Sequence, residues 1–305
     1  MPDPLCARIF QQSLKSKMNL PQNKKETFGN IVAELIKLDN IVAVVLGGSF
    51  ATGRATENSD LDIGIYYNEK MPFNIEEIKR IAEKQSVENV PIVTDFYQWG
   101  PWVNGGAWIH TESGKVDFLY RNLDQVKSTI ESANSGEWQK HYEQQPPYGF
   151  SSVIYLAEIE NCIPVFDTED IISKLKSSIK NYPPKLKETI IQQGLWAAEF
   201  TLINAVDFAE KDDFYNTFGS ITRTVKNIVD VLFAINETYP IGDKKAIEIL
   251  SKLSLSPNNL ASRVNTTLTA DKNSLSENIF LLRRLFDDVV ELTDGVYKPQ
   301  FDFKK

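Results

Sequence analysis

Residues 46–62 read LGGSFATGRATENSDLD and follow an apolar, β-branched run that is typical of a strand buried on both faces. The two glycines end that strand. From Asp60 to Tyr67 polar and apolar residues alternate, which predicts a second strand with one polar and one apolar face. Asp60 and Asp62 share the polar face although Asp is depleted in strands, so the pair indicates chemistry rather than folding.

The carboxylates of Asp60 and Asp62 leave the same side of the strand, roughly 6–7 Å apart along the chain. Two like charges that close destabilise each other, and a divalent cation removes the conflict. Magnesium suits the pair because it binds carboxylate and phosphate oxygens together. Asp117 lies in another amphipathic run, KVDFLY, and would complete a cluster of three carboxylates if its strand lies beside the first. Such a cluster can hold two metal ions for a phosphoryl or nucleotidyl transfer.

The glycines predict a place for phosphate. A strand that runs into Gly47, Gly48 and Ser49 and then into a short helix can turn backbone N–H groups and a hydroxyl toward phosphate oxygens, with no Cβ in the way. The chain has neither GK[ST] after these glycines nor a GxGxxG pattern. A P-loop hydrolase and a dinucleotide-binding protein therefore lack their fingerprints here.

The spacing of Gly-Gly-Ser, ten further residues and Asp-Leu-Asp resembles the nucleotidyltransferase superfamily of DNA polymerase beta, whose signature is hG[GS] followed by DhD. The resemblance implies that Gly48 and Ser49 contact a triphosphate. It also implies that Asp60 and Asp62 bind Mg²⁺, with Asp117 as the third carboxylate. A catalytic domain followed by helices is similar in layout to bacterial antibiotic nucleotidyltransferases of the kanamycin and lincosamide kinds, and to minimal nucleotidyltransferases.

Four further residues are candidates for contact with the nucleotide phosphates. Arg54 and Ser59 lie between the two motifs, but Arg54 could equally neutralise a helix C-terminus and Ser59 could cap a turn. Lys244 and Lys245 follow a Pro-Gly turn at a predicted helix start and could approach the phosphates from the second domain. The alternative for this lysine pair is a solvated surface position.

A transfer to a hydroxyl also needs a proton acceptor, and a carboxylate in the cleft is the usual one. Glu112, Glu143 and Glu158 are open for this role. We choose Glu158 because it lies on the first helix of the predicted helical domain, near a cleft expected between the domains.

Three tryptophans in the stretch QWGPWVNGGAW, namely Trp99, Trp102 and Trp108, can stack on a base or line an acceptor cleft. Packing against a Gly- and Pro-rich loop is the commoner use of such residues and is the interpretation that we favour.

The order of patterns predicts two domains. Strands and helices alternate over residues 1–135, which predicts an α/β nucleotidyltransferase catalytic domain around a small mixed sheet. Residues 136–149 are rich in Gly, Pro, Ser and Gln and are predicted to be a linker. Over residues 150–305 helical periodicity dominates, which predicts an all-α helical bundle.

Composition narrows the partners. A formal net charge of -8 provides no field to attract nucleic acid and suits a cationic small molecule, such as an aminoglycoside-like antibiotic. The two cysteines lack CxxC spacing, and His110 and His141 have no partner at metal-ligand spacing, so disulfides and zinc are not expected. Cysteine usage favours the cytoplasm, and the sequence shows neither an export signal nor a membrane segment.

The sequence therefore predicts transfer of a nucleoside monophosphate, AMP from ATP or the equivalent from another NTP, to a hydroxyl of a small-molecule acceptor. The reaction would use two Mg²⁺ ions and release pyrophosphate. Two alternatives stay open: an enzyme that modifies a protein or a transfer RNA, and a non-catalytic nucleotide-binding regulatory module.

Overall fold

The computed structural model describes residues 18–87, 90–167 and 169–301. Contacts divide the chain into two compact units, the first made of residues 1–131 and 140–181 and the second of residues 132–139 and 182–305. The first unit is α/β, and the second is built from helices. The predicted fold class, an α/β domain with a mixed sheet followed by an all-α region, is confirmed.

The first unit is organised around a six-stranded sheet with the order β3-β4-β5-β2-β1-β8. Strands β2 and β5 are parallel, and the other neighbouring strands are antiparallel, so the sheet is mixed. The strands are β1 (Ile41–Leu46), β2 (Leu61–Tyr67), β3 (Ile92–Val93), β4 (Gly106–Thr111), β5 (Gly114–Asn122) and β8 (Ile163–Asp167).

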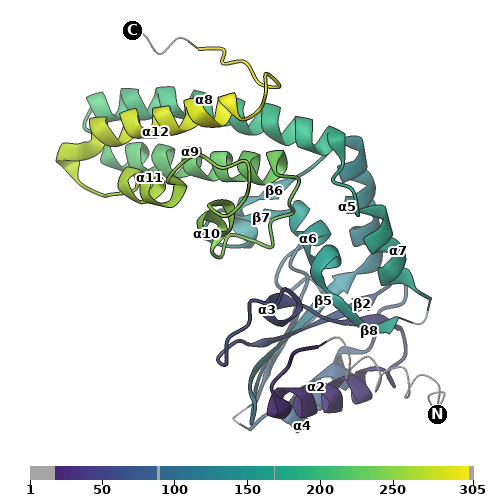
Figure 1. The fold of residues 1–305 in the computed structure, drawn as a ribbon. Helices are drawn as coiled ribbons and strands as arrows, with labels where there is room; N and C mark the ends of the chain where they lie inside the picture. Colours follow the sequence, from purple (N-terminus) through teal and green to yellow (C-terminus); the bar gives the residue numbers. More distant parts are fainter. Residues whose placement is uncertain (1–17, 88–89, 168, 302–305) are drawn as a thin grey trace. The chain divides into compact units, whose positions relative to one another are not determined.

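One face of this sheet forms the core. Helices α2 (Gln22–Leu35) and α4 (Ile75–Gln85) lie against it (Figure 1). The apolar set of the alternating run in β2, which includes Ile63 and Ile65, is fully buried beneath them. Asn74 caps α4, because its side chain accepts a hydrogen bond from the backbone N–H of Glu76.

The opposite face is covered at one end only. Helix α6 (Val153–Asn161) packs over the last residues of β2 and β5, where Tyr66 and Arg121 are buried. At the other end of the same strands Asp60, Asp62 and Asp117 are partly exposed. The helix therefore leaves the polar end of this face accessible.

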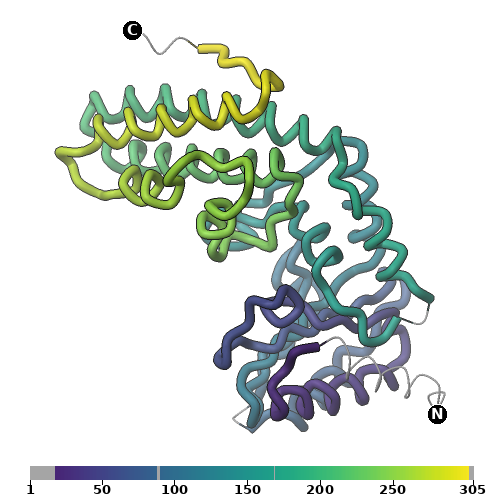
Figure 2. Tube along the Cα trace, viewed as in Figure 1, coloured from purple at the N-terminus to yellow at the C-terminus, as the bar shows by residue number. Residues whose placement is uncertain are grey.

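Helices follow closely after β1 and β5 in the first unit. Helix α3 (Gly48–Ala51) follows β1, and helix α5 (Leu123–Ser135) follows β5 and ends in the second unit. Figure 2 traces the chain from β1 through the turn at α3 and back into β2. The remaining elements of the unit are β6 (Lys140–His141), η1 (Tyr142–Gln144), β7 (Phe150–Ser151) and α7 (Ile171–Ser178).

The second unit is a set of packed helices around an apolar core. Helix α8 begins at Pro184, where the missing N–H costs nothing, and α9 turns back along it (Figures 1 and 2). Helix α12 packs against both. The elements are α8 (Pro184–Glu210), α9 (Phe214–Ile235), α10 (Ala246–Leu250), α11 (Leu260–Thr267), η2 (Lys272–Ser274) and α12 (Leu275–Glu291). Among the described residues, no helix combines the length and hydropathy needed to cross a bilayer.

The division of the chain differs from the linker predicted at 136–149. Residues 140–181 belong to the first unit, because β8 returns to pair with β1 at the edge of the sheet and α6 covers the sheet face. The short run IPVFD contains a proline, which is tolerated on an edge strand but hides the strand from a reading of sequence pattern. Residues 132–139 belong to the second unit, where Trp138 donates a hydrogen bond to Gln193.

The two faces of β5 yield a stability prediction. Phe118 is fully buried in the core, and Leu119 points to the opposite face and is partly exposed. Phe118→Ala is expected to lower the free energy of unfolding of the first unit by about 3–5 kcal/mol, because it leaves a cavity. Leu119→Ala is the matched control and should cost about 1 kcal/mol. Urea titrations followed by circular dichroism measure both, and equal costs would contradict the assigned faces.

Candidate active site

The register of β2 and β5 brings two of the predicted carboxylates together. Asp62 lies directly opposite Asp117 on these parallel strands. Residues opposite each other on neighbouring strands point to the same face, and the strands are about 4.8 Å apart. Asp60 immediately precedes β2 and leaves the same face, because it is two residues before Asp62. Asp60, Asp62 and Asp117 therefore lie at one end of one sheet face, and these three carboxylates are called the acidic group below.

Lys115 stands among these carboxylates. Its Nζ lies 3.0 Å from the carboxylate of Asp117 and 3.6 Å from Oδ2 of Asp60. Burial favours loss of its proton, but the hydrogen bond and charge of Asp117, together with Asp60, outweigh this and raise the pKa of Lys115 above its ordinary value. A positive charge thus already offsets the repulsion within the acidic group. Sequence spacing alone did not reveal this lysine.

The glycine turn after β1 lies against Asp62. The N–H of Gly47 donates to the backbone carbonyl of Asp62 at 2.8 Å. Gly48 has φ +59, and a Cβ placed there would lie 1.7 Å from Oδ2 of Asp62. Only glycine therefore fits beside this carboxylate in this rotamer. Ser49 follows within α3 and is partly exposed.

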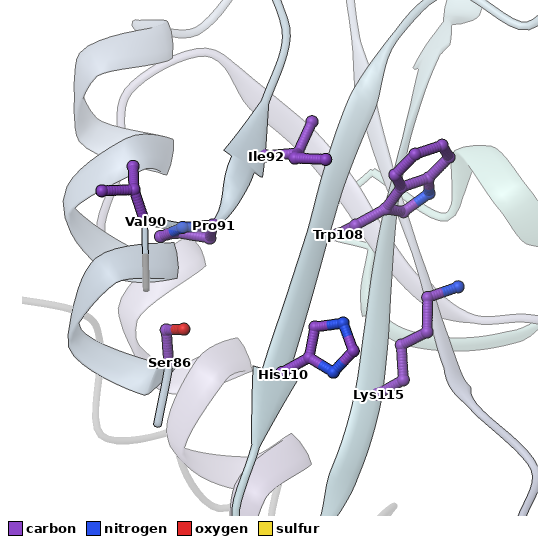
Figure 3. A pocket seen from close by; sticks show the side chains of 7 residues that line it. All are labelled: Ser86, Val90, Pro91, Ile92, Trp108, His110 and Lys115. Atoms are coloured by element: carbon purple, nitrogen blue, oxygen red, sulfur yellow. The ribbon is translucent and has the colours of Figure 1, made fainter. Parts of the chain in front are cut away.

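A cavity of about 490 Å³ opens beside the acidic group (Figure 3). Trp108 of β4 lies opposite Asp117 in the sheet register, and His110 lies opposite Lys115, so all four share the face. Figure 3 shows Trp108 and His110 on one strand, with the amine of Lys115 directed toward the indole. The lining residues are Ser86, Val90, Pro91, Ile92, Trp108, His110 and Lys115.

Residues 26–102 match the family model described as "Nucleotidyltransferase domain". The match includes β1, the glycine turn, Asp60 and β2 with Asp62, and it ends before β5. The first unit contains a nucleotidyltransferase domain. No protein with a curated description matches the sequence. Among solved structures, a nucleotidyltransferase-like protein from Exiguobacterium sibiricum is similar at 7% identity and TM-score 0.45, over 91% of this chain and 80% of its own.

The acidic group of the nucleotidyltransferase domain fits a divalent cation by its chemistry. Carboxylate oxygens are the donors that Mg²⁺ prefers, and the Lys115 ammonium stands in for a cation between Asp60 and Asp117. Within residues 18–87, 90–167 and 169–301, no three His, Cys, Asp or Glu side chains are already grouped as metal ligands. A divalent cation bound here would compete with the Lys115 ammonium for the carboxylates of Asp60 and Asp117.

Glu158 is engaged elsewhere in the first unit. Arg121 donates from Nε and Nη2 to the two oxygens of Glu158 at 2.6 and 2.7 Å. Arg121 is only 4% exposed and also donates to the backbone carbonyls of Tyr120 and Val103. Both oxygens of Glu158 thus neutralise a buried cation, whose isolation would be costly. This pairing disfavours the predicted role of Glu158 as proton acceptor.

The positions of the other candidates for phosphate contact do not show whether they bind phosphate. Ser59 accepts a hydrogen bond from the N–H of Thr56 at 2.9 Å, as the turn-capping alternative requires. Arg54 is exposed in the same loop. Lys244 and Lys245 are exposed in the second unit, directly before α10, and their contact with phosphate stays a prediction.

The tryptophans divide between packing and exposure. Trp102 packs on Phe150 and Tyr155, at ring-centroid distances of 5.8 and 5.6 Å, which is the role expected for a loop residue. Trp99 stacks on Trp108 at 5.0 Å. Trp108 itself remains 42% exposed on the face of the acidic group.

The close fit of Gly48 against Asp62 predicts a specific loss of metal binding. Gly48→Ala should weaken Mn²⁺ binding by about 10–100-fold, because the new methyl group displaces the Asp62 carboxylate. Gly53→Ala is the matched control, since Gly53 also has positive φ, +69, but has open space around its Cβ position. Electron paramagnetic resonance of free Mn²⁺ measures both affinities. Equal affinities in the two variants would contradict the placement.

Proposed function

We propose that the protein is a metal-dependent nucleotidyltransferase that moves a nucleoside monophosphate from an NTP to a hydroxyl of a small-molecule acceptor and releases pyrophosphate. The observation that carries the proposal is the register that sets Asp62 beside Asp117, with the glycine turn against Asp62. Acidic residues and a glycine turn packed against one of them supply the two halves of such a site. The family match supports nucleotide transfer in general.

The residues take distinct roles in this proposal. The backbone N–H of Gly48 and the hydroxyl of Ser49 bind the phosphate tail of the NTP, and Gly47, whose N–H is bonded to the Asp62 carbonyl, shapes the turn that presents them. Asp60, Asp62 and Asp117 are the ligands for Mg²⁺. A divalent cation held there supplies Lewis-acid stabilisation of the charge that develops on the transferring phosphoryl group. ATP as donor of AMP, and the use of two ions, follow from the superfamily resemblance.

Glu158 takes a positioning role in place of proton transfer. It fixes the guanidinium of Arg121, which in turn binds carbonyls of the loop before β4 and of β5 itself. The pair therefore holds the end of the strand that carries Asp117. The proton of the acceptor hydroxyl would pass to a carboxylate of the acidic group, the nearest bases on this face.

The acceptor class has more than one candidate. The net charge of -8 favours a cationic small molecule, such as an aminoglycoside-like antibiotic, and disfavours transfer RNA. A protein acceptor stays a further alternative. In this proposal the enzyme acts in the cytoplasm, the location that the cysteine usage favours.

A second candidate function is nucleotide binding without catalysis. The position of Lys115 favours it, because an ammonium between Asp60 and Asp117 could bind a phosphate without any metal ion. In that case the protein would be a regulatory module that reports the presence of a nucleotide. The two functions differ in whether pyrophosphate is released.

The test is a transfer assay with matched variants. The protein is incubated with Mg²⁺, labelled ATP, CTP, GTP or UTP, and a panel of aminoglycosides, aromatic alcohols, transfer RNA and proteins. Asp60→Asn should lower label transfer by about 100-fold or more, because a carboxylate ligand is lost. Asp39→Asn is the control, since Asp39 is an exposed carboxylate outside the acidic group.

Wild-type turnover by Asp60→Asn would contradict the proposed mechanism. Tight NTP binding with no pyrophosphate release for any acceptor would instead support the non-catalytic module.

A further inference from the structure

We propose that the cavity beside Asp117 is the acceptor pocket, and that it takes a flat ring, uncharged or anionic, which carries the reacting hydroxyl. This inference rests on the proposed nucleotidyl transfer and adds the class of its second substrate. It is carried by the sheet order, by the exposed indole of Trp108 and by the charges of the lining residues.

The sheet order fixes the direction from which an acceptor approaches. The glycine turn follows β1 and lies on one side of β2, and β5 and β4 follow in order on the other side. In an in-line transfer the attacking oxygen enters opposite the leaving pyrophosphate. With the phosphate tail at the glycine turn, the acceptor enters across Asp117 from the side of β4. The cavity lies on that side.

The walls of the cavity suit a flat ring. The indole of Trp108 is 42% exposed, and the ring of Trp99 stacks on it at 5.0 Å. Ile92, which is 53% exposed, lies opposite Trp108 in the register of β3 and β4 and adds an apolar wall. A rigid aromatic face of this kind binds planar groups by stacking, at little cost in side-chain order.

The charges of the cavity distinguish between acceptors. The ammonium of Lys115 lies 5.7 Å from the Trp108 ring centre, and His110 lies beside it on the same face. Among the described lining residues, none is Asp or Glu. The carboxylates of Asp60 and Asp117 pair with the Lys115 ammonium but do not line the cavity. At the cavity wall a polycation would therefore meet the ammonium, which repels it, whereas a neutral or anionic ring is not repelled. The negative net charge of the whole chain therefore does not predict the charge of the residues that line this pocket.

The size of the cavity supports a small acceptor. The cavity is open to solvent, and its volume of about 490 Å³ is within the roughly 300–1,000 Å³ range of small-molecule sites. Lys115 both lines the cavity and contacts Asp117, so the pocket and the acidic group share a wall. A ring seated on Trp108 would thus present its hydroxyl to the carboxylates.

The test uses 6-hydroxy-2-naphthalenesulfonate as a flat anionic probe and kanamycin as a polycationic comparator, with direct binding measured by calorimetry on the full chain. Trp108→Ala should weaken binding of the naphthalene probe by about tenfold, because it removes the stacking surface. Trp196→Ala is the matched control, with a tryptophan that is 44% exposed in the second unit, and it should change nothing. His110→Glu should weaken the probe and favour kanamycin, because it adds a negative charge to one wall.

Kinetics with an aromatic alcohol acceptor separate the pocket from the site of the nucleotide. Trp108→Ala should raise the KM for the acceptor and leave the KM for NTP unchanged. The proposal would be overturned if Trp108→Ala changed only the KM for NTP or left the affinity for the probe unchanged. It would also be overturned if the wild type bound kanamycin more tightly than the probe. Probe binding does not require turnover. If the protein never releases pyrophosphate, the proposed function is contradicted, and the effect of Trp108→Ala on probe binding still tests whether the cavity binds a flat ring.

Discussion

The mutual repulsion of Asp60, Asp62 and Asp117 on one sheet face is the constraint on which the rest of the site depends. Neighbouring carboxylates on one sheet face repel each other, and positive charge beside them stabilises their charged forms. In the structure that charge comes from Lys115, which contacts two of the three. Lys115 also lines the neighbouring cavity, so the side chain that neutralises the acidic group forms part of the cavity wall. A bound divalent cation would take over this neutralising role and release the amine.

The core residues and the candidate site residues lie on opposite faces of the sheet. The apolar alternate residues of β2, β4 and β5 form the core beneath α2 and α4, and the polar alternate residues form the site. A slip of one residue in the register would exchange the two sets, so the packing of the core also fixes the geometry of the carboxylates. Gly48 adds a second restraint, since its missing Cβ lets the backbone approach Asp62.

The sequence predicted the features that follow a local rule. Period-two alternation identified β2 and β5, and the spacing from the glycines to Asp62 identified the superfamily. The pairing of Glu158 with Arg121 and the return of β8 to the sheet depend on contacts between segments that are distant in the chain, which no local pattern encodes. The exposure of Trp108 was missed for the same reason, because a Trp-rich loop reads as packing unless the register is known.

The most direct measurement of the central claim is a double-mutant cycle on the Mn²⁺ affinity of Asp62→Asn and Asp117→Asn. Two ligands of one ion lose much of their separate effect once the other is gone. Each single change is therefore expected to weaken Mn²⁺ binding, and the double change is expected to cost clearly less than the sum of the two single changes. Strictly additive losses, or an Asp117→Asn protein that binds Mn²⁺ as tightly as the wild type, would show that the two carboxylates do not share a cation.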